Sequence, residues 1–302
     1  MALDVLHQRL AARFGERALA GESLARHTSY RIGGPADLLV RPDTAEELAL
    51  ILREAREAGV AVTLLGGGSN MLVGDGGIRG LVVKLGRGFR QVEWQDAAVR
   101  AGAAVQIGKL ARASVERGLT GLEHAEGIPG TVGGALFMNA GAYGGDTAGA
   151  VESVECIDPD GRLVALARDG LAFTYRRAHL PPGFVVAAVT FRLRPDDPAA
   201  VRARLEHWRG KRLASQPQGL PNAGSIFKNP SGDHAGRLIE AAGLKGWRVG
   251  GARFSEHHAN FIVNDGGARA ADVQALMAIA QRAVWERSGI WLEPEVRLVG
   301  SW

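Results

Sequence analysis

The sequence predicts an α+β fold of two or three domains, and three observations lead to this prediction. Strand-like and helix-like segments follow one another without a regular βαβ repeat. The chain has 302 residues, enough for two or three cores, and its 46% hydrophobic content is ordinary for a globular protein. A charged stretch begins at Pro195–Pro198. We therefore place a domain boundary near residue 200, between an N-terminal region (1–200) and a C-terminal domain (201–302).

The N-terminal region is expected to hold two α+β subdomains, about 1–85 and 86–200. An amphipathic helix is predicted over 1–16 and a second helix over 44–59, where Thr44 and Glu47 form a capping box and Gly59 ends the helix. The other patterns predict a strand at 60–66, a strand at 81–85, an alternating segment near 92–99, a helix over about 105–117 closed by Gly118, and antiparallel strands at 151–157, 163–167 and 184–193.

The C-terminal domain is introduced by a charged helix within 196–213. Helices are then predicted at about 233–242 and 271–287, on either side of a strand at 259–264, and the chain ends in a strand at 295–300. We expect that last strand to be able to return to the N-terminal region.

Composition excludes several classes of protein. No apolar run reaches the ~20 residues needed to cross a bilayer, and the N-terminus lacks the pattern of a secretory signal, so we expect a cytoplasmic protein that does not bind membranes. The net charge of +4 is spread along the chain, which argues against nucleic acid as a partner.

Cysteine and histidine give little sign of a metal or redox site. Cys156, the only cysteine, lies in a strand-like run and is more consistent with a buried inert thiol than with a nucleophile. The adjacent His257 and His258 would point to opposite sides of a strand. We therefore predict no metal site.

Two glycine-rich segments are the strongest functional signal. Residues 122–145 are rich in glycine and nearly free of charge, which fits either a tight structural turn or a backbone cradle for a ligand. The run Gly66–Asn70 follows a strand, where backbone N–H groups can form an anion-binding nest. It is neither a P-loop nor a dinucleotide fingerprint, because no Gly-Lys-Ser/Thr and no helix pattern follow. Together the segments favour an extended dinucleotide held by two loops.

At this point the sequence resembles a known family. The runs LLGGGSNMLV and GIPGTVGGALFMNAGAYG look like the FAD-binding domain of the UDP-N-acetylenolpyruvoylglucosamine reductases. Five further motifs resemble that family in the same order: HTSYRIGGPAD, FTYRR at 173–177, NAGSIFKNP at 222–230, HANFIVN at 258–264 and LEPEVRLVG at 292–300. The resemblance covers nearly the whole chain. The short connection from Arg176 to Ser225 resembles the subclass without an extra tyrosine-bearing loop.

The resemblance implies a fold, cofactors and a reaction. It implies that residues 1–200 form a two-part FAD-binding region of the PCMH/vanillyl-alcohol-oxidase type and that residues 201–302 bind the substrate. It implies non-covalent FAD, NADPH as reductant and a UDP-sugar substrate. Separately, we expect the protein to be a monomer. The reaction implied is reduction of UDP-N-acetyl-3-O-(1-carboxyvinyl)-glucosamine to UDP-N-acetylmuramate in peptidoglycan precursor synthesis, with hydride carried by the flavin.

The resemblance also assigns residues. Arg176 and Glu295 would stabilise the substrate carboxylate and enolate, and Ser225 would donate the proton. The residues assigned to the cofactor are Gly66, Gly67, Gly68, Ser69, Asn70, Gly127, Ile128, Pro129, Gly130, Thr131, Gly133, Gly134, Asn139, Gly141, Ala142 and Tyr143. Those assigned to the substrate are Tyr175, Lys228, Asn229, His258 and Arg297. Without the resemblance, Ser225 would be interpreted as a turn residue and Glu295 as a surface carboxylate.

The sequence departs from the family's pattern at two places, and other functions stay open. Arg177-Ala178 follow Arg176 where the family often has a serine, and Glu126 stands where a small or neutral residue is usual. One alternative is another FAD-dependent oxidase or dehydrogenase of the same superfamily. Another is a flavin-binding protein without activity. The motifs AGSIFKNP and EPEVRLVG favour the reductase over both.

Overall fold

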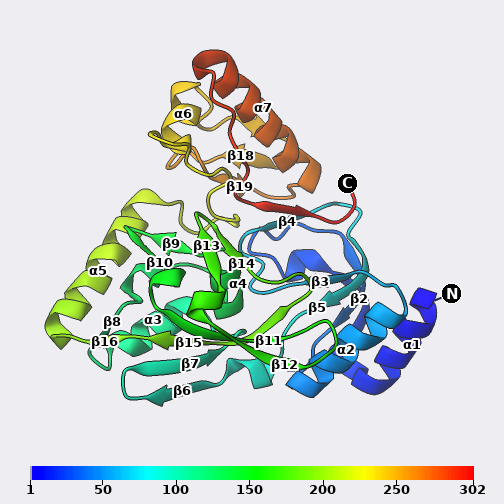
Figure 1. Ribbon diagram of the computed structural model, residues 1–302. Coiled ribbons are helices and arrows are strands. Elements are labelled where there is room, and N and C mark those ends of the chain that lie inside the picture. The colour runs from blue at the N-terminus through cyan, green and yellow to red at the C-terminus, as the bar shows by residue number, and fades with distance from the viewer. Residues whose placement is uncertain (1) are drawn as a thin grey trace. The chain divides into compact units, whose positions relative to one another are not determined.

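The computed structural model describes residues 2–302, and Figure 1 shows its elements coloured along the chain. The described chain forms two compact units. The first unit contains the residues up to 20 together with 38–67 and 80–212, and the second contains 21–37, 68–79 and 213–302. Met1, which the predicted helix over 1–16 includes, lies outside the described residues.

The centre of the first unit is a five-stranded antiparallel sheet in the order β12-β11-β15-β7-β6. Its strands are β12 (Leu163–Ala167), β11 (Val151–Ile157), β15 (Val185–Arg192), β7 (Ala98–Gly102) and β6 (Val92–Gln95). Val154 of β11 pairs with Val189 of β15, and both are fully buried. The predictions for 151–157 and 163–167 are confirmed to the residue, because both runs are short and mostly apolar, which is typical of strands. The segment near 92–99 forms two strands that turn at Asp96, whose φ is 50°.

A second sheet has the order β1-β2-β5-β3, and the chain passes from one unit to the other within three of its strands. These are β1 (Ala18–Ser23), β2 (Pro35–Val40) and β5 (Ile78–Val83), while β3 (Val62–Leu64) pairs in parallel with β5. Helices α1 (Ala2–Phe14) and α2 (Ala45–Glu57) bury Leu10, Leu48 and Ile51 in a core that includes Leu38.

The second predicted helix begins and ends where its sequence indicates. Thr44 caps α2 by accepting a hydrogen bond from the Glu47 N–H, and Gly59 follows it with φ 64°. Helix α3 (Ile107–Val115) is followed by Gly118 with φ 67°, as predicted. The other elements of the first unit are short: β8 (Leu119–Thr120), β9 (Gly141–Ala142), β10 (Gly145–Asp146), β13 (Ala172–Thr174), β14 (Arg177–His179) and β16 (Arg194–Pro195).

One helix was not predicted. Helix α4 (Val132–Phe137) lies inside the glycine-rich stretch, and Thr131 caps it by accepting from the Gly134 N–H. A Cβ on Gly133 would lie 3.0 Å from the Ala103 Cβ, so the glycine lets the helix pack closely against its neighbour. Tertiary packing therefore stabilises a helix that local propensity disfavours.

The second unit packs two helices on a small antiparallel sheet. The sheet joins β17 (Arg248–Val249), β18 (Ala252–Phe254) and β19 (Ile262–Asn264), and the helices are α6 (Ala235–Ala241) and α7 (Ala270–Ser288). Phe254, Ile262 and Leu276 are fully buried in its core. The charged helix predicted within 196–213 is α5 (Pro198–Ser215).

The last strand, β20 (Arg297–Val299), pairs in parallel with β4 (Met71–Val73). The compact units therefore differ from the predicted ranges. Segments 21–37 and 68–79 belong to the second unit, and the units divide at 212/213 rather than near 200. The β4–β20 pairing and the hydrogen bond from the Tyr30 hydroxyl to the Ile262 carbonyl, 2.9 Å long, account for this. The assignment of cofactor and substrate binding to 1–200 and 201–302 remains a prediction.

Candidate functional site

The two glycine-rich segments meet in the first unit. A Cβ on Gly67 would lie 2.7 Å from the Gly130 Cα, and a Cβ on Gly66 would lie 3.0 Å from the Thr131 Oγ1. Such distances leave no room for side chains, so the backbones approach each other directly. Gly66 and Gly67 are exposed, and their N–H groups donate to no acceptor among residues 2–302. This cradle fits a diphosphate group, which backbone N–H donors bind without side chains.

The rest of the first glycine segment belongs to the second unit. Gly68 has φ 63°, and a Cβ there would lie 2.2 Å from the His27 carbonyl oxygen. The Asn70 side chain donates to the Glu295 carbonyl at 3.1 Å, and its own carbonyl accepts from the Arg297 N–H at 3.0 Å. Asn70, predicted to bind the cofactor, therefore also holds the segment that carries two other predicted site residues.

The loop before α4 is tied to α3 by an ion pair. Arg112 Nη1 lies 2.8 and 2.9 Å from the two carboxylate oxygens of Glu126, which is buried. The next residue, Gly127, has φ 70°, and a Cβ there would lie 2.7 Å from the Arg212 Cδ. The departure from the family's pattern at Glu126 is thus matched by a partner on the neighbouring helix.

Arg176 occupies the tip of the β13–β14 hairpin, in a two-residue turn between Thr174 and Arg177. Its φ is 61°, a left-handed conformation that costs a residue with a Cβ about 1–2 kcal/mol. Nη1 of Arg176 donates to the Gly141 carbonyl at 2.9 Å. The guanidinium also lies 5.0 Å from the ring centre of the exposed Tyr175. The hairpin therefore places the predicted catalytic guanidinium against the glycine-rich stretch.

Two further predicted residues share this left-handed backbone. The φ angles are 40° at Asn139 and 56° at Tyr143. Backbone strain of this kind often gathers at functional sites, where surrounding contacts maintain it. The Tyr143 ring stacks on Trp208 of α5 with a centroid distance of 4.7 Å and an angle of 4°. Lys211 Nζ lies 5.0 Å from the Trp208 ring centre.

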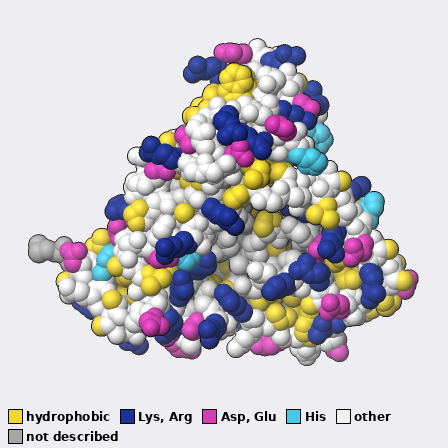
Figure 2. Space-filling model, turned by 180° about the vertical axis from the view of Figure 1, so that it is seen from behind, with side chains coloured by type: hydrophobic (Ala, Val, Ile, Leu, Met, Phe, Trp, Pro, Cys, Tyr) yellow, Lys and Arg dark blue, Asp and Glu magenta, His cyan; other side chains and the backbone are white. Residues whose placement is uncertain are grey.

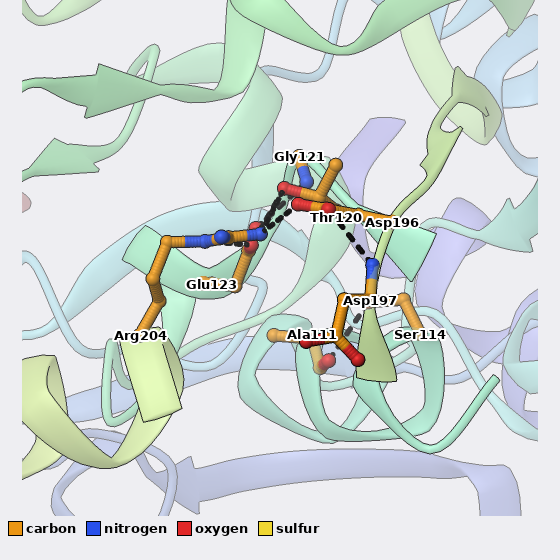
Figure 3. Close-up of polar contacts among 8 residues, drawn as sticks. All are labelled: Ala111, Ser114, Thr120, Gly121, Glu123, Asp196, Asp197 and Arg204. Carbon is orange, nitrogen blue, oxygen red and sulfur yellow. Dashed lines mark hydrogen bonds and ion pairs between the residues drawn. The ribbon is translucent and has the colours of Figure 1, made fainter. Parts of the chain in front are cut away.

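Helix α5 is fixed beside the start of the glycine-rich stretch by a polar cluster (Figure 3). Arg204 bonds Glu123 at 3.1 Å, Thr120 at 3.1 Å and Asp196 at 2.6 Å. Although burial alone raises the pKa of Glu123, hydrogen bonds from Thr120, the Gly121 N–H and Arg204 hold it below its usual value. Arg204 therefore pairs with an ionised carboxylate and sets the position of the helix that carries Trp208.

Ser225 and Glu295 lie on paired segments of the second unit. The Glu295 N–H donates to the Ile226 carbonyl at 2.8 Å, and the Lys228 N–H donates to the Glu293 carbonyl at 2.9 Å. The Ser225 side chain is half-buried, and its hydroxyl has no hydrogen-bond partner within the described part of the chain. The pairing brings these two predicted catalytic residues onto neighbouring backbone.

A residue that the sequence did not indicate holds this pairing in place. The Asn260 amide accepts from the Phe227 N–H at 3.0 Å and donates to the Phe227 carbonyl at 2.8 Å. Its own carbonyl accepts from the Ile226 N–H at 2.9 Å. Asn260 lies within the quoted HANFIVN motif, so only the motif as a whole, and not the residue, was a signal.

Several predicted substrate residues have partners inside the second unit. Lys228 Nζ forms an ion pair with Glu293 at 2.5 Å. The Asn229 Oδ1 accepts a hydrogen bond at 3.1 Å from the N–H of Ala235, the first residue of α6. His258 packs on Phe261, and a Cβ on Gly236 would lie 2.8 Å from its Cε1. Their contacts with substrate remain a proposal.

Three further predictions concern metal binding, the reactivity of Cys156 and membrane spans. Residues 2–302 contain no group of three or more His, Cys, Asp or Glu side chains placed to hold a metal ion. Burial raises the pKa of Cys156 to about 12, in keeping with an inert thiol. Within the same residues, no helix is both long and apolar enough to cross a membrane. On the face shown in Figure 2, Lys and Arg side chains are spread among acidic ones.

Comparison with known proteins defines the class first. A family model described as an FAD binding domain matches residues 36–167. This match and the glycine cradle define the chain as an FAD-binding protein. A second model, described as the C-terminal domain of UDP-N-acetylenolpyruvoylglucosamine reductase, matches residues 216–299. The chain belongs to the UDP-N-acetylenolpyruvoylglucosamine reductase family and is an FAD-dependent oxidoreductase.

The relatives match along their whole length. The chain is 48% identical over 298 residues to UDP-N-acetylenolpyruvoylglucosamine reductase of Geobacter metallireducens, with 99% of each chain covered. It is 47% identical over 301 residues to the enzyme of the same name from Moorella thermoacetica, covering 100% of this chain and 99% of the relative. These matches confirm the resemblance inferred from the motifs, and the C-terminal match favours the reductase over another flavin oxidase.

A solved structure gives the same result. The crystal structure of UDP-N-acetylenolpyruvylglucosamine reductase from Thermus caldophilus superposes with a TM-score of 0.81 at 38% identity, covering 93% of this chain and 97% of that one. The predicted α+β fold and FAD as cofactor are therefore confirmed.

Proposed function

We propose that this protein reduces UDP-N-acetyl-3-O-(1-carboxyvinyl)-glucosamine to UDP-N-acetylmuramate with NADPH, in peptidoglycan precursor synthesis. We further propose that it acts as a cytoplasmic monomer. The observation that carries the proposal is the joint presence of the cradle at Gly66, Gly67 and Gly130, the Arg176 hairpin, and the paired segments of Ser225 and Glu295. Bound FAD supplies hydride transfer from NADPH to the vinyl carbon.

The protein's own residues would bind, orient and protonate. Gly66 and Gly67 are exposed residues, and their N–H groups, which have no acceptor among residues 2–302, suit the diphosphate of the cofactor. The Arg176 guanidinium can hold the substrate carboxylate with two parallel hydrogen bonds and stabilise the enolate that hydride addition creates. Glu295 would polarise the same carboxylate together with Arg176.

The proton would come from Ser225. Addition of hydride to the terminal vinyl carbon leaves negative charge on the neighbouring carbon, beside the carboxylate. The Ser225 hydroxyl has no partner within residues 2–302, so it is available to donate to that carbon. A serine is a weak acid, but a carbanionic acceptor is a strong base, and the two fit each other.

The two half-reactions test this function. With Ser225→Ala, flavin reduction by NADPH should proceed at the native rate, whereas reoxidation by the enolpyruvyl substrate should slow by about 10²-fold or more. Stopped-flow absorbance of the flavin measures both, and Ser231→Ala serves as a matched exposed serine control. Native-like reoxidation in Ser225→Ala would remove Ser225 from the acid role.

The overall reaction, the oligomeric state and the cellular location can each be tested separately. Native protein that purifies without flavin and cannot take up FAD, or that is not reoxidised by the substrate, would contradict the proposed reaction. Light scattering after size exclusion should give the mass of one chain, 31.9 kDa. Cell fractionation should recover the enzyme with the cytoplasmic proteins.

A further inference from the structure

Contacts within the protein occupy most of the hydrogen-bonding groups of the Asn139 amide. It is buried, with an exposed fraction of 4%. Its Nδ2 donates to the Asp146 Oδ2 at 3.1 Å and to the Thr174 carbonyl at 3.2 Å, and its Oδ1 accepts from the Ala148 N–H at 3.0 Å. These three bonds leave at most one lone pair for a ligand. The amide is therefore poorly suited to the cofactor contact that the sequence suggested.

One of those bonds reaches the hairpin of Arg176. Thr174 is the last residue of β13 and stands directly before the two-residue turn. The same turn is held from its other end, because Arg176 Nη1 donates to the Gly141 carbonyl, two residues beyond Asn139. Gly141 itself pairs with Asp146, the second partner of the Asn139 amide. A closed network thus joins residues 139–146 to the turn.

We propose that Asn139 is a positioning residue for Arg176, which sets the direction of the guanidinium by tethering the hairpin to the cofactor-binding stretch. The left-handed backbone at both residues fits this role, because strained turns persist only where neighbouring bonds hold them. Asn is also the non-glycine residue that best tolerates such a conformation and carries a donor that can reach a distant carbonyl. The inference rests on the proposed function, since Arg176 is taken to hold the substrate carboxylate.

Exchanging the side chains of Asn139 and Asp146 distinguishes the positioning of Arg176 from a role that is confined to the loop of residues 139–146. Asn139→Asp alone places a carboxylate against Asp146 and against the Thr174 carbonyl. In the double variant Asn139→Asp/Asp146→Asn, the amide at 146 can donate to the carboxylate at 139, so the bond within the loop is restored. The Thr174 carbonyl still loses its donor. The remaining change is confined to the hairpin, where a carboxylate oxygen faces the Thr174 carbonyl in place of the donor that tethers it.

The double variant should take up FAD and accept hydride from NADPH as the native enzyme does. Its reoxidation by the enolpyruvyl substrate should slow by about 10- to 100-fold, the cost of a misplaced catalytic group. Calorimetric titration should show that preference for UDP-N-acetylmuramate over UDP-N-acetylglucosamine, which lacks the carboxylate, falls in parallel. Val154→Ala, a buried change in β11 of the same unit, controls for lost stability.

A third readout does not depend on bound cofactor. Hydrogen exchange of the amides in 172–179 should be faster in the double variant than in Val154→Ala, because the hairpin has lost its tether. Native-like exchange there, or native-like reoxidation and carboxylate preference in the FAD-loaded double variant, would overturn the inference. If instead the native enzyme fails to reduce the substrate, the proposed function fails, which is a separate result.

Discussion

The ring of Tyr143 lies parallel to the indole of Trp208, with centroids 4.7 Å apart and planes 4° from parallel. The stack connects the glycine-rich stretch to α5, which Arg204 anchors through Glu123 and Asp196. Tyr143 has a left-handed φ of 56°, a conformation that is unfavourable for a residue other than glycine. Trp208 therefore contributes to the shape of the predicted cofactor loop from a helix that the sequence predicted by its charge, without any sign of this contact.

Trp208→Ala should weaken FAD binding, because the Tyr143 loop loses the aromatic surface that orders it. An aromatic pair contributes about 0.5–1.5 kcal/mol beyond its buried area, so we expect about a 3- to 10-fold higher Kd for FAD. Trp208→Phe keeps a ring and should restore most of the affinity. Titration of apo-protein with FAD measures this. An unchanged Kd in Trp208→Ala would limit the stack to packing.

The elements that the sequence predicted well are those whose signals are local. Thr44 and Gly59 delimit α2, and a short, mostly apolar run marks β11. Helix α4 escaped prediction because its glycines disfavour a helix, and only the close packing of Gly133 on Ala103 makes them useful. The ranges of the compact units also depended on a distant pairing, that of β4 with β20.

In the candidate site, too, contacts between residues far apart in the sequence could not be predicted from local patterns. Motifs indicated Ser225 and Glu295 as members of a set, but no local pattern shows that their segments are joined by backbone hydrogen bonds. Asn139 was assigned to the cofactor from its place in a glycine-rich run. Its partner at Thr174 lies far along the chain, so its contact with the hairpin could be found only in three dimensions.

Replacing Arg112 and replacing Glu126, the two partners of one ion pair, should lower the free energy of unfolding by different amounts. Glu126 keeps only 5% of its side chain exposed, whereas Arg112 keeps 47%. Arg112→Ala strands a buried carboxylate and should lower the free energy of unfolding by about 1–3 kcal/mol, while Glu126→Gln leaves a guanidinium that water can solvate and should cost less. Urea unfolding at a fixed excess of FAD measures both.

Arg162→Ala is the matched control for that pair, because Arg162 and Asp160 are both well exposed and 3.6 Å apart. Its effect should be close to zero. Equal losses in Arg112→Ala and Glu126→Gln would show that burial of the carboxylate does not govern the energy of the pair.

Stability should fall in mild acid because of buried histidine. Burial lowers the pKa of His124 below its usual 6.5, although Asp146 and Glu123 oppose part of the shift. Burial lowers the pKa of His258 in the same way. Since the unfolded chain then binds more protons, this stability is fully present above pH 6.5 and is lost as the pH falls toward the folded pKa.

His124→Gln should flatten the decline in the free energy of unfolding between pH 7 and pH 5. Each histidine contributes at most one proton, or about 1.4 kcal/mol per pH unit. His234→Gln, the same substitution at an exposed position, is the control variant. The measurement is urea unfolding at a series of pH values. If His124→Gln leaves the dependence of the free energy of unfolding on pH unchanged, the loss of stability in mild acid does not come from His124.

Gly67→Ala should separate the two glycine segments. The added methyl would lie 2.7 Å from the Gly130 Cα, a backbone atom that cannot yield without moving its loop. FAD affinity should fall by about 10-fold or more, since a shift of even 1 Å misplaces the N–H donors. In Gly210→Ala the methyl meets nothing within 4 Å on α5, and helix propensity should raise stability by up to about 1 kcal/mol without changing FAD affinity. Because both variants add the same group, a native-like Kd for FAD in Gly67→Ala would show that the cofactor does not depend on this close approach, and the cradle would have to be sought elsewhere.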